Sequence, residues 1–191
     1  MLEGAGIDHL ACAHSLGTLC VFSELTASLR QVIFSAFDPI NGRGKELRRI
    51  GAPQPLSTEW YPLSPEWYPY GWDLSQDGSR LAFTLGGKEE DQIQILPLDG
   101  GEDRVIKVSG WSGLGSPSWA ADGRGLYVSP TTGSATGTVL YVDLGGHADV
   151  IWRSREPGFG FMPRVSPSPD GRHLAVPALL HYTNVWLLEN F

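Results

Sequence analysis

Lysine is scarce in this sequence, and positive charge as a whole is outnumbered. Only Lys45, Lys88 and Lys107 occur among 191 residues, and 14 lysines and arginines face 21 acidic residues, for a net charge of −7. Nucleic-acid binding depends on Lys and Arg side chains that neutralise phosphates. The nearest approach to a basic cluster, residues 43–49, is interrupted by Glu46 and is expected to be a solvated strand edge. This segment is therefore not expected to bind nucleic acid.

Long apolar runs and helical periodicity are also missing. No stretch approaches the roughly 18–20 apolar residues of a membrane span. Residues 1–8 show neither the basic region nor the apolar core of a signal peptide. Glycine (24 residues) and proline (14 residues) are abundant, which disfavours long helices and suits short strands joined by tight turns. We expect an all-β fold with neither a membrane span nor a signal peptide in this segment.

Only two cysteines are present, Cys12 and Cys20, and they flank an expected turn at residues 15–18. If the flanking residues pair as a hairpin, the two thiols face each other across the strands. A disulfide needs Cβ atoms about 3.5–4.5 Å apart, which facing hairpin positions nearly supply. The sequence leaves open a disulfide or two small buried thiols.

Motifs for catalysis and metal binding are missing as well. Ser15 lies in Ala-His-Ser-Leu-Gly, one residue away from the Gly-x-Ser-x-Gly nucleophile elbow, but that elbow needs a helix after it and a strand is expected here. The acidic stretches 88–91 and 99–103 do not follow the alternation of a calcium loop. No zinc motif includes any of the five histidines, which are His9, His14, His147, His173 and His181. No catalytic residue, metal or cofactor is expected.

The sequence does contain an internal repeat. Asp-Gly pairs lie at 77–78, 122–123 and 170–171, at spacings of 122 − 77 = 45 and 170 − 122 = 48 residues. Each pair separates two alternating apolar runs, which predicts a tight hairpin turn with positive φ at Gly78, Gly123 and Gly171. A degenerate copy upstream aligns Phe34 with Phe83 and lacks the Asp-Gly pair.

A second pair of strands is expected after the first in each full copy. Residues 92–98 and 104–108 form such a pair in one copy, and residues 138–144 and 149–152 in the next. Four strands per repeat of about 45 residues is the size of a propeller blade. We therefore predict one domain, an all-β propeller of about four four-stranded antiparallel blades. The predicted blades are residues 18–60, 70–109, 116–153 and 164–191.

The repeat resembles a known family. Residues 168–175, Ser-Pro-Asp-Gly-Arg-His-Leu-Ala, are similar to the TolB-type, WD40-like propeller repeat. Segments 20–24, 34–39, 42–47 and 184–191 resemble the C-terminal propellers of acidobacterial signalling proteins. There, such a propeller follows a Ser/Thr kinase or winged-helix domain, usually across a membrane segment. The resemblance covers about residues 10–191, but no kinase, winged-helix or membrane segment is present.

This resemblance implies a function of binding or sensing. We expect a non-catalytic module that binds a protein or ligand in a bacterial signalling protein, with a periplasmic location favoured. Two alternatives stay open: the accessory propeller of a prolyl-oligopeptidase-type hydrolase, and a structural scaffold. The repeat does not identify the ligand, because propeller sites lie in loops.

Closure of the ring is a separate question, because propellers of this type usually have six or more blades. The last copy ends after its third strand, while residues 7–13 read as a strand without a blade. We predict a partial propeller in which Ile7–Ala13 is a closing strand paired with Val185–Leu188. A fragment of a longer ring, a homodimer that completes the propeller and a tight four-bladed ring remain alternatives.

One group of side chains is a candidate partner surface. Aromatic residues concentrate between two copies of Glu-Trp-Tyr-Pro, and aromatics are frequent in binding hot spots. Packing between blades is the alternative interpretation. The candidates are Trp60, Tyr61, Trp67, Tyr68 and Tyr70, and Trp72 adjoins them.

Overall fold

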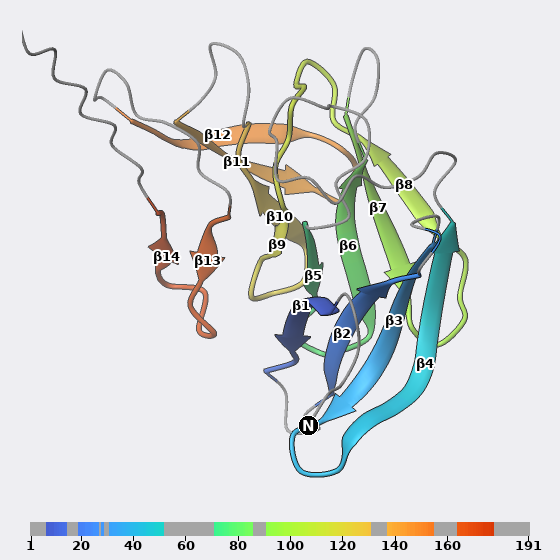
Figure 1. Cartoon of the computed structure of the whole chain (residues 1–191). Coiled ribbons are helices and arrows are strands. Elements are labelled where there is room, and N and C mark those ends of the chain that lie inside the picture. The colour runs from blue at the N-terminus through green and yellow to red at the C-terminus, as the bar shows by residue number, and fades with distance from the viewer. Residues whose placement is uncertain are drawn as a thin grey trace, which may run out of the picture.

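A computed structural model of the chain describes residues 7–14, 19–26, 28, 31–51, 71–85, 91–130, 137–154 and 164–177. Across these residues the secondary structure consists of strands and turns, with no helix. The strands form three four-stranded sheets and one two-stranded sheet, all with antiparallel pairing (Figure 1). This arrangement confirms the predicted all-β partial propeller.

Each sheet is a meander in which strands adjacent in sequence pair with each other. The first sheet contains β1 (Ile7–Cys12), β2 (Cys20–Leu25), β3 (Gln31–Asp38) and β4 (Gly42–Gly51). The second contains β5 (Trp72–Leu74), β6 (Arg80–Leu85), β7 (Gln92–Pro97) and β8 (Arg104–Lys107). The third contains β9 (Ser118–Trp119), β10 (Gly125–Val128), β11 (Thr138–Asp143) and β12 (Ala148–Arg153). The fourth contains β13 (Ser166–Pro167) and β14 (Leu174–Ala175).

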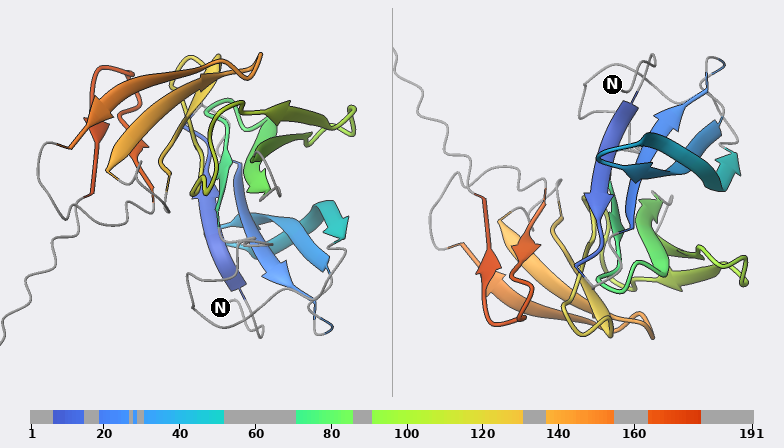
Figure 2. Two further views of the ribbon diagram at one scale, coloured as in Figure 1. Left: turned by 90° about the horizontal axis from the view of Figure 1, so that it is seen from above. Right: turned by 90° about the horizontal axis from the view of Figure 1, so that it is seen from below.

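The first strands of the four sheets lie next to one another. β1 contacts β5, β5 contacts β9, and β9 contacts β13. Seen from above and below, the sheets fan out from these inner strands, and β4 and β8 lie farther out (Figure 2). The molecule therefore has the blade arrangement of a propeller, with one short inner strand per blade.

The strand β1 is a correction to the predicted topology. Ile7–Cys12 is a strand, but it pairs with β2, with Cys12 opposite Cys20. It is thus the inner strand of the first blade and not an extra strand. The local hairpin accounts for this pairing, because Ala13 N donates to Leu19 O at 2.8 Å and a disulfide joins Cys12 to Cys20. Its predicted partner Val185–Leu188 lies outside the described residues.

The alignment of the degenerate repeat needs the same correction. Phe83 in β6 lies opposite Trp72, and Phe22 in β2 lies opposite Leu10, so both belong to the second strand of their blades. Phe34, by contrast, belongs to the third strand. The alignment of Phe34 with Phe83 was wrong by one strand, because strand periodicity looks alike in neighbouring strands and the first turn has no Asp-Gly pair to mark it.

The apolar core lies between blades. One buried cluster joins the first and second blades and includes Phe34, Trp72 and Leu81. Another joins the second and third blades and includes Ile93, Trp119 and Leu140. Because alternate residues of a strand face opposite sides of its sheet, each blade can contribute to both neighbouring clusters. Burial of these faces holds successive blades together.

The Asp-Gly turns have the predicted backbone and an additional constraint. Gly78, Gly123 and Gly171 have φ of 73°, 67° and 68°. A Cβ atom on Gly78 would lie 3.1 Å from Ala13 Cβ in the first blade, and one on Gly171 would lie 3.1 Å from Ala121 Cβ in the third. These turns therefore contact the turn of the preceding blade so closely that a side chain would crowd it.

Replacement of Gly78 tests this contact. Gly42 is a matched control, because its φ is 86° and a Cβ atom there would meet nothing within 4 Å. We expect Gly42→Val to cost about 1–3 kcal/mol for the backbone alone. Gly78→Val should cost about 1–3 kcal/mol more, because it also crowds Ala13. Urea unfolding measures both. Equal losses in the two variants would show that the turns do not press on each other.

Candidate functional site

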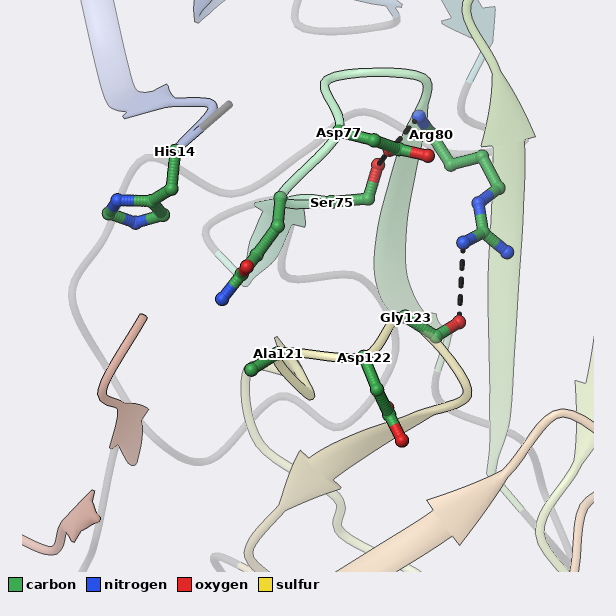
Figure 3. A pocket seen from close by; sticks show the side chains of 8 residues that line it. His14, Ser75, Asp77, Arg80, Ala121, Asp122 and Gly123 are labelled. Atoms are coloured by element: carbon green, nitrogen blue, oxygen red, sulfur yellow. Dashed lines mark hydrogen bonds between the residues drawn. The ribbon is translucent and has the colours of Figure 1, made fainter. Parts of the chain in front are cut away.

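The turns between the first two strands of the first three blades line an open pocket of about 300 Å³. We call it the turn-face pocket (Figure 3). Its walls come from the first three blades. The lining residues are His14, Ser75, Gln76, Asp77, Arg80, Ala121, Asp122 and Gly123.

Asp77 holds the turn of the second blade. Its Oδ1 accepts hydrogen bonds from Ser75 Oγ at 2.6 Å, Ser79 N at 3.0 Å and Ser79 Oγ at 2.8 Å. Burial raises the pKa of the Asp77 carboxyl, but these hydrogen bonds outweigh burial and the net shift is downward. The carboxylate is therefore ionised at neutral pH and acts as an acceptor at the edge of the pocket.

Arg80 connects the second and third blades across the pocket. Its guanidinium carbon lies 4.5 Å from the centre of the Trp119 ring, and its Nη2 donates to Gly123 O at 3.2 Å. The dashed line between Arg80 and Gly123 in Figure 3 marks this second contact. Cation–π contact and the hydrogen bond together hold the guanidinium against the third blade. Arg80 therefore forms a fixed wall of the pocket.

His14 and Gln76 extend the pocket to the other blades. His14 N donates to Gln76 O at 3.1 Å, which joins the first turn to the second. Gln76 Nε2 donates to Pro169 O of the fourth blade at 3.4 Å. The His14 side chain is exposed. The turn-face pocket is thus a composite of turns that contact one another, and each turn is fixed by a tight hairpin.

A second polar group lies farther along the inner strands, and we call it the axial cluster. It consists of His9, Asp73, Ser118 and Arg164, which come from β1, β5, β9 and the residues before β13. Arg164 is at its centre and forms an ion pair with Asp73 Oδ1. Arg164 Nε donates to Ser118 Oγ at 3.2 Å, and its Nη1 lies 2.8 Å from His9 Nε2. One arginine therefore contacts the inner strands of the other three blades.

Hydrogen bonds complete the axial cluster. Asp73 Oδ2 accepts from Trp119 N at 2.8 Å, and Ser118 Oγ donates to Val165 O at 2.6 Å. Burial raises the pKa of Asp73, while the Arg164 guanidinium and the Trp119 amide oppose that rise. Both carboxylate oxygens of Asp73 thus have donors, as a buried charge requires.

His9 is neutral in this setting. Burial, and then the nearby Arg164 charge, lower the pKa of His9 from 6.5 to about 4. Since a guanidinium can only donate, His9 Nε2 must accept from Arg164 and carries no proton. Its ring also meets Trp72 edge-on, with ring centres 4.8 Å apart.

The structure separates the residues that the sequence singled out. Trp60, Tyr61, Trp67, Tyr68 and Tyr70 lie outside the described residues, as does Ser15. Trp72, which adjoins the aromatic group, is fully buried in the core, and its Nε1 donates to Ser23 Oγ at 2.8 Å. His9 and His14 belong to the axial cluster and the turn-face pocket. In the part of the chain that is described, no three His, Cys, Asp or Glu residues form a group that could hold a metal.

Sequence reasoning identified the Asp-Gly turns but neither the pocket between them nor the axial cluster. No sequence motif singled out Arg164 or Asp73. Within the described residues no helix has the length and apolar character of a membrane span.

Comparison with known proteins supports the fold. No known protein family matches the sequence. No curated protein matches it either. Among solved structures, TolB from Acinetobacter baumannii is similar at 15% identity and a TM-score of 0.56, over 93% of this chain and 39% of TolB. The β-propeller domain of Cps50 (Swd1) from Myceliophteria thermophila is similar at 16% identity and a TM-score of 0.55, over 92% of this chain and 50% of that domain.

A prolyl endopeptidase is also similar, at 22% identity and a TM-score of 0.52, over 91% of this chain and 26% of that protein. This chain therefore corresponds to half or less of the length of these structures. The likeness defines the class of fold, which is a β-propeller. The catalytic and binding properties of those proteins do not follow from it.

The depressed pKa of His9 predicts a pH dependence of stability. Unfolded His9 takes up a proton near pH 6.5, whereas folded His9 does so only near pH 4. The free energy of unfolding should therefore fall between pH 6.5 and pH 4 by about 1–2 kcal/mol, after allowance for solvent screening. In the His9→Gln variant, the free energy of unfolding should not show this fall. The His147→Gln variant, changed at an exposed turn, should show the same fall as the wild type. Urea unfolding at several pH values measures the difference. Parallel curves for all three proteins would contradict it.

Proposed function

We propose that this chain is a non-catalytic recognition module of a bacterial signalling protein, and that it binds its ligand or partner at the turn-face pocket. The observation that carries the proposal is the composite lining of that pocket. Polar side chains from three blades line one open pocket of about 300 Å³, on turns that contact one another. Propellers suit such a role, because loops held by rigid blades can present side chains in fixed positions.

The chemistry of the lining favours binding over catalysis. Ser75 Oγ donates to Asp77, but a carboxylate with a lowered pKa is a weak base and does not activate a hydroxyl. Arg80 is held by Trp119 and Gly123. These groups stabilise the turns first, and they offer fixed charges and acceptors to a bound molecule.

The ligand that matches this lining offers hydrogen-bond donors. Asp77 and Asp122 contribute two carboxylates and Arg80 one guanidinium, so acceptors and negative charge predominate. A protonated amine, or a peptide segment with a basic side chain, fits this chemistry. Such a ligand need not span the whole face, because the pocket volume suits a small molecule or one or two side chains.

A sequence resemblance and a disulfide support the proposed signalling role and location. Segments at both ends of the sequence resemble C-terminal propellers of acidobacterial signalling proteins, and this resemblance implies binding or sensing. The Cys12–Cys20 disulfide supports an oxidising compartment such as the periplasm, because disulfides persist there and are rare in the cytosol.

A ligand screen tests the proposal. The protein is incubated with amines and basic peptides, and the melting temperature and the mass of each compound are measured in the same samples. We expect binders that raise the melting temperature and come back chemically unchanged.

Variants then locate the site. Asp122→Asn removes one charge from the pocket but can keep the hydrogen bond that Asp122 Oδ1 accepts from Arg124 N at 3.0 Å. It should weaken binding about tenfold. Asp149→Asn is the matched control, since it removes the same charge on β12. Equal effects of the two variants would place the binding elsewhere, and conversion of a compound would contradict the non-catalytic role.

A further inference from the structure

The first blade closes its inner turn differently from the other three. In the later blades an aspartate accepts the amide of the residue two positions on: Asp77 from Ser79 at 3.0 Å, Asp122 from Arg124 at 3.0 Å and Asp170 from Arg172 at 3.1 Å. The first turn, residues 13–19, reads Ala-His-Ser-Leu-Gly-Thr-Leu and contains no aspartate. A disulfide between Cys12 and Cys20 stands directly outside it.

The disulfide therefore constrains the first turn, as the aspartate hydrogen bonds constrain the later turns. We call these aspartate hydrogen bonds the aspartate clamps. It joins the last residue of β1 to the first residue of β2, next to the backbone hydrogen bond from Ala13 N to Leu19 O. A disulfide restricts the loop that it closes mainly by reducing the freedom of the open state. Without it, the described ends of the first turn keep the backbone hydrogen bonds from Ala13 N to Leu19 O and from His14 N to Gln76 O.

The two residues of this disulfide differ in their exposure to solvent. Cys12 is exposed, whereas Cys20 is only 3% exposed. Exposed disulfides are the ones that thiols attack most readily. An incoming thiolate would reach the sulfur of Cys12 first, and Cys20 would be the leaving thiolate.

The first turn is also coupled to the turn-face pocket. The His14 side chain lines the pocket, and His14 N donates to Gln76 O of the second turn at 3.1 Å. Ala13, one residue away from the disulfide, lies 3.1 Å from the Cβ position of Gly78. A change in the first turn therefore reaches both the wall of the pocket and the turn beside it.

We propose that the Cys12–Cys20 disulfide is a redox latch of the turn-face pocket: the oxidised bond holds the wall at His14 in place, and reduction of the bond loosens this wall. This proposal builds on the binding role assigned to that pocket. A dithiol reductant breaks the sulfur–sulfur bond in two steps. One thiolate forms a mixed disulfide with Cys12 and releases Cys20 as a thiolate. The second thiol of the reductant then displaces Cys12. Two electrons and two protons pass to the cysteines, which end as thiols, and the reductant ends as a disulfide.

Reduction opens the first turn and leaves the blades folded. The buried clusters between blades do not contain the sulfur–sulfur bond, and the turns of the second, third and fourth blades keep their aspartate clamps. The oxidised protein has the complete pocket, and the reduced protein has a pocket with one loosened wall at His14.

Amide hydrogen exchange tests the latch without any ligand. The chain is compared before and after treatment with dithiothreitol, with complete reduction confirmed by mass. We expect the amides of Ala13 and His14 to exchange about tenfold faster or more after reduction. The amides of β10 and β11 should keep their rates.

The double variant C12S/C20S is the control. It should exchange fast at Ala13 and His14 with or without dithiothreitol, which separates the loss of the bond from other effects of the reagent. Unchanged rates at His14 in the reduced wild type would overturn the proposal. So would an equal increase in β10 and β11, because the bond would then be a general stabiliser. A failed ligand screen would overturn only the binding role, since this experiment uses no ligand.

Discussion

The ion pair between Arg164 and Asp73 is the interaction on which the arrangement of the blades depends. Within the described residues, apolar clusters join each blade to the next one along the chain, and none of these clusters connects the fourth blade to the first or second. Arg164 makes those connections through His9 and Asp73. Because a largely buried charge without a partner is costly, the inner strands must keep the positions that let Asp73, Ser118 and His9 contact one guanidinium.

The position of the turn-face pocket follows from this constraint. Asp73 and Ser75 belong to the same short stretch of chain, so fixing Asp73 at the axis also fixes where the turn at residues 76–79 begins. The turns then meet through direct contacts, such as that between the Cβ position of Gly78 and Ala13, and through the hydrogen bond from His14 N to Gln76 O. The pocket is a consequence of how blades pack, and its chemistry comes from side chains that also hold the turns. Stability and the proposed binding therefore share residues at this face.

Features with a local physical cause could be predicted from the sequence. The Asp-Gly pairs at 77–78, 122–123 and 170–171 specified hairpins because a tight turn there needs positive φ, and the alternation after them specified strands. The first blade was misplaced because its turn is closed by a disulfide, which leaves no such signal.

The axial cluster depends on contacts between residues far apart in sequence. Its one sequence signal is a large residue at a repeat position where the other copies have small ones. Arg164 lies seven residues before Gly171 (171 − 164 = 7). The same position holds Gly71 before Gly78 (78 − 71 = 7) and Ser116 before Gly123 (123 − 116 = 7). A large cation at a position of small residues marks a special role, but the partner cannot be read from one chain.

The most direct test of this account is a double-mutant cycle between Asp73 and Arg164. Asp73→Asn, Arg164→Gln and the double variant are compared with the wild type by urea unfolding at pH 7. If the ion pair joins the second and fourth blades, each single variant should be destabilised and the coupling energy should be about 1–3 kcal/mol, because the pair is largely removed from water. Additive losses, with a coupling energy near zero, would show that the blades hold their positions without this pair and would contradict the account.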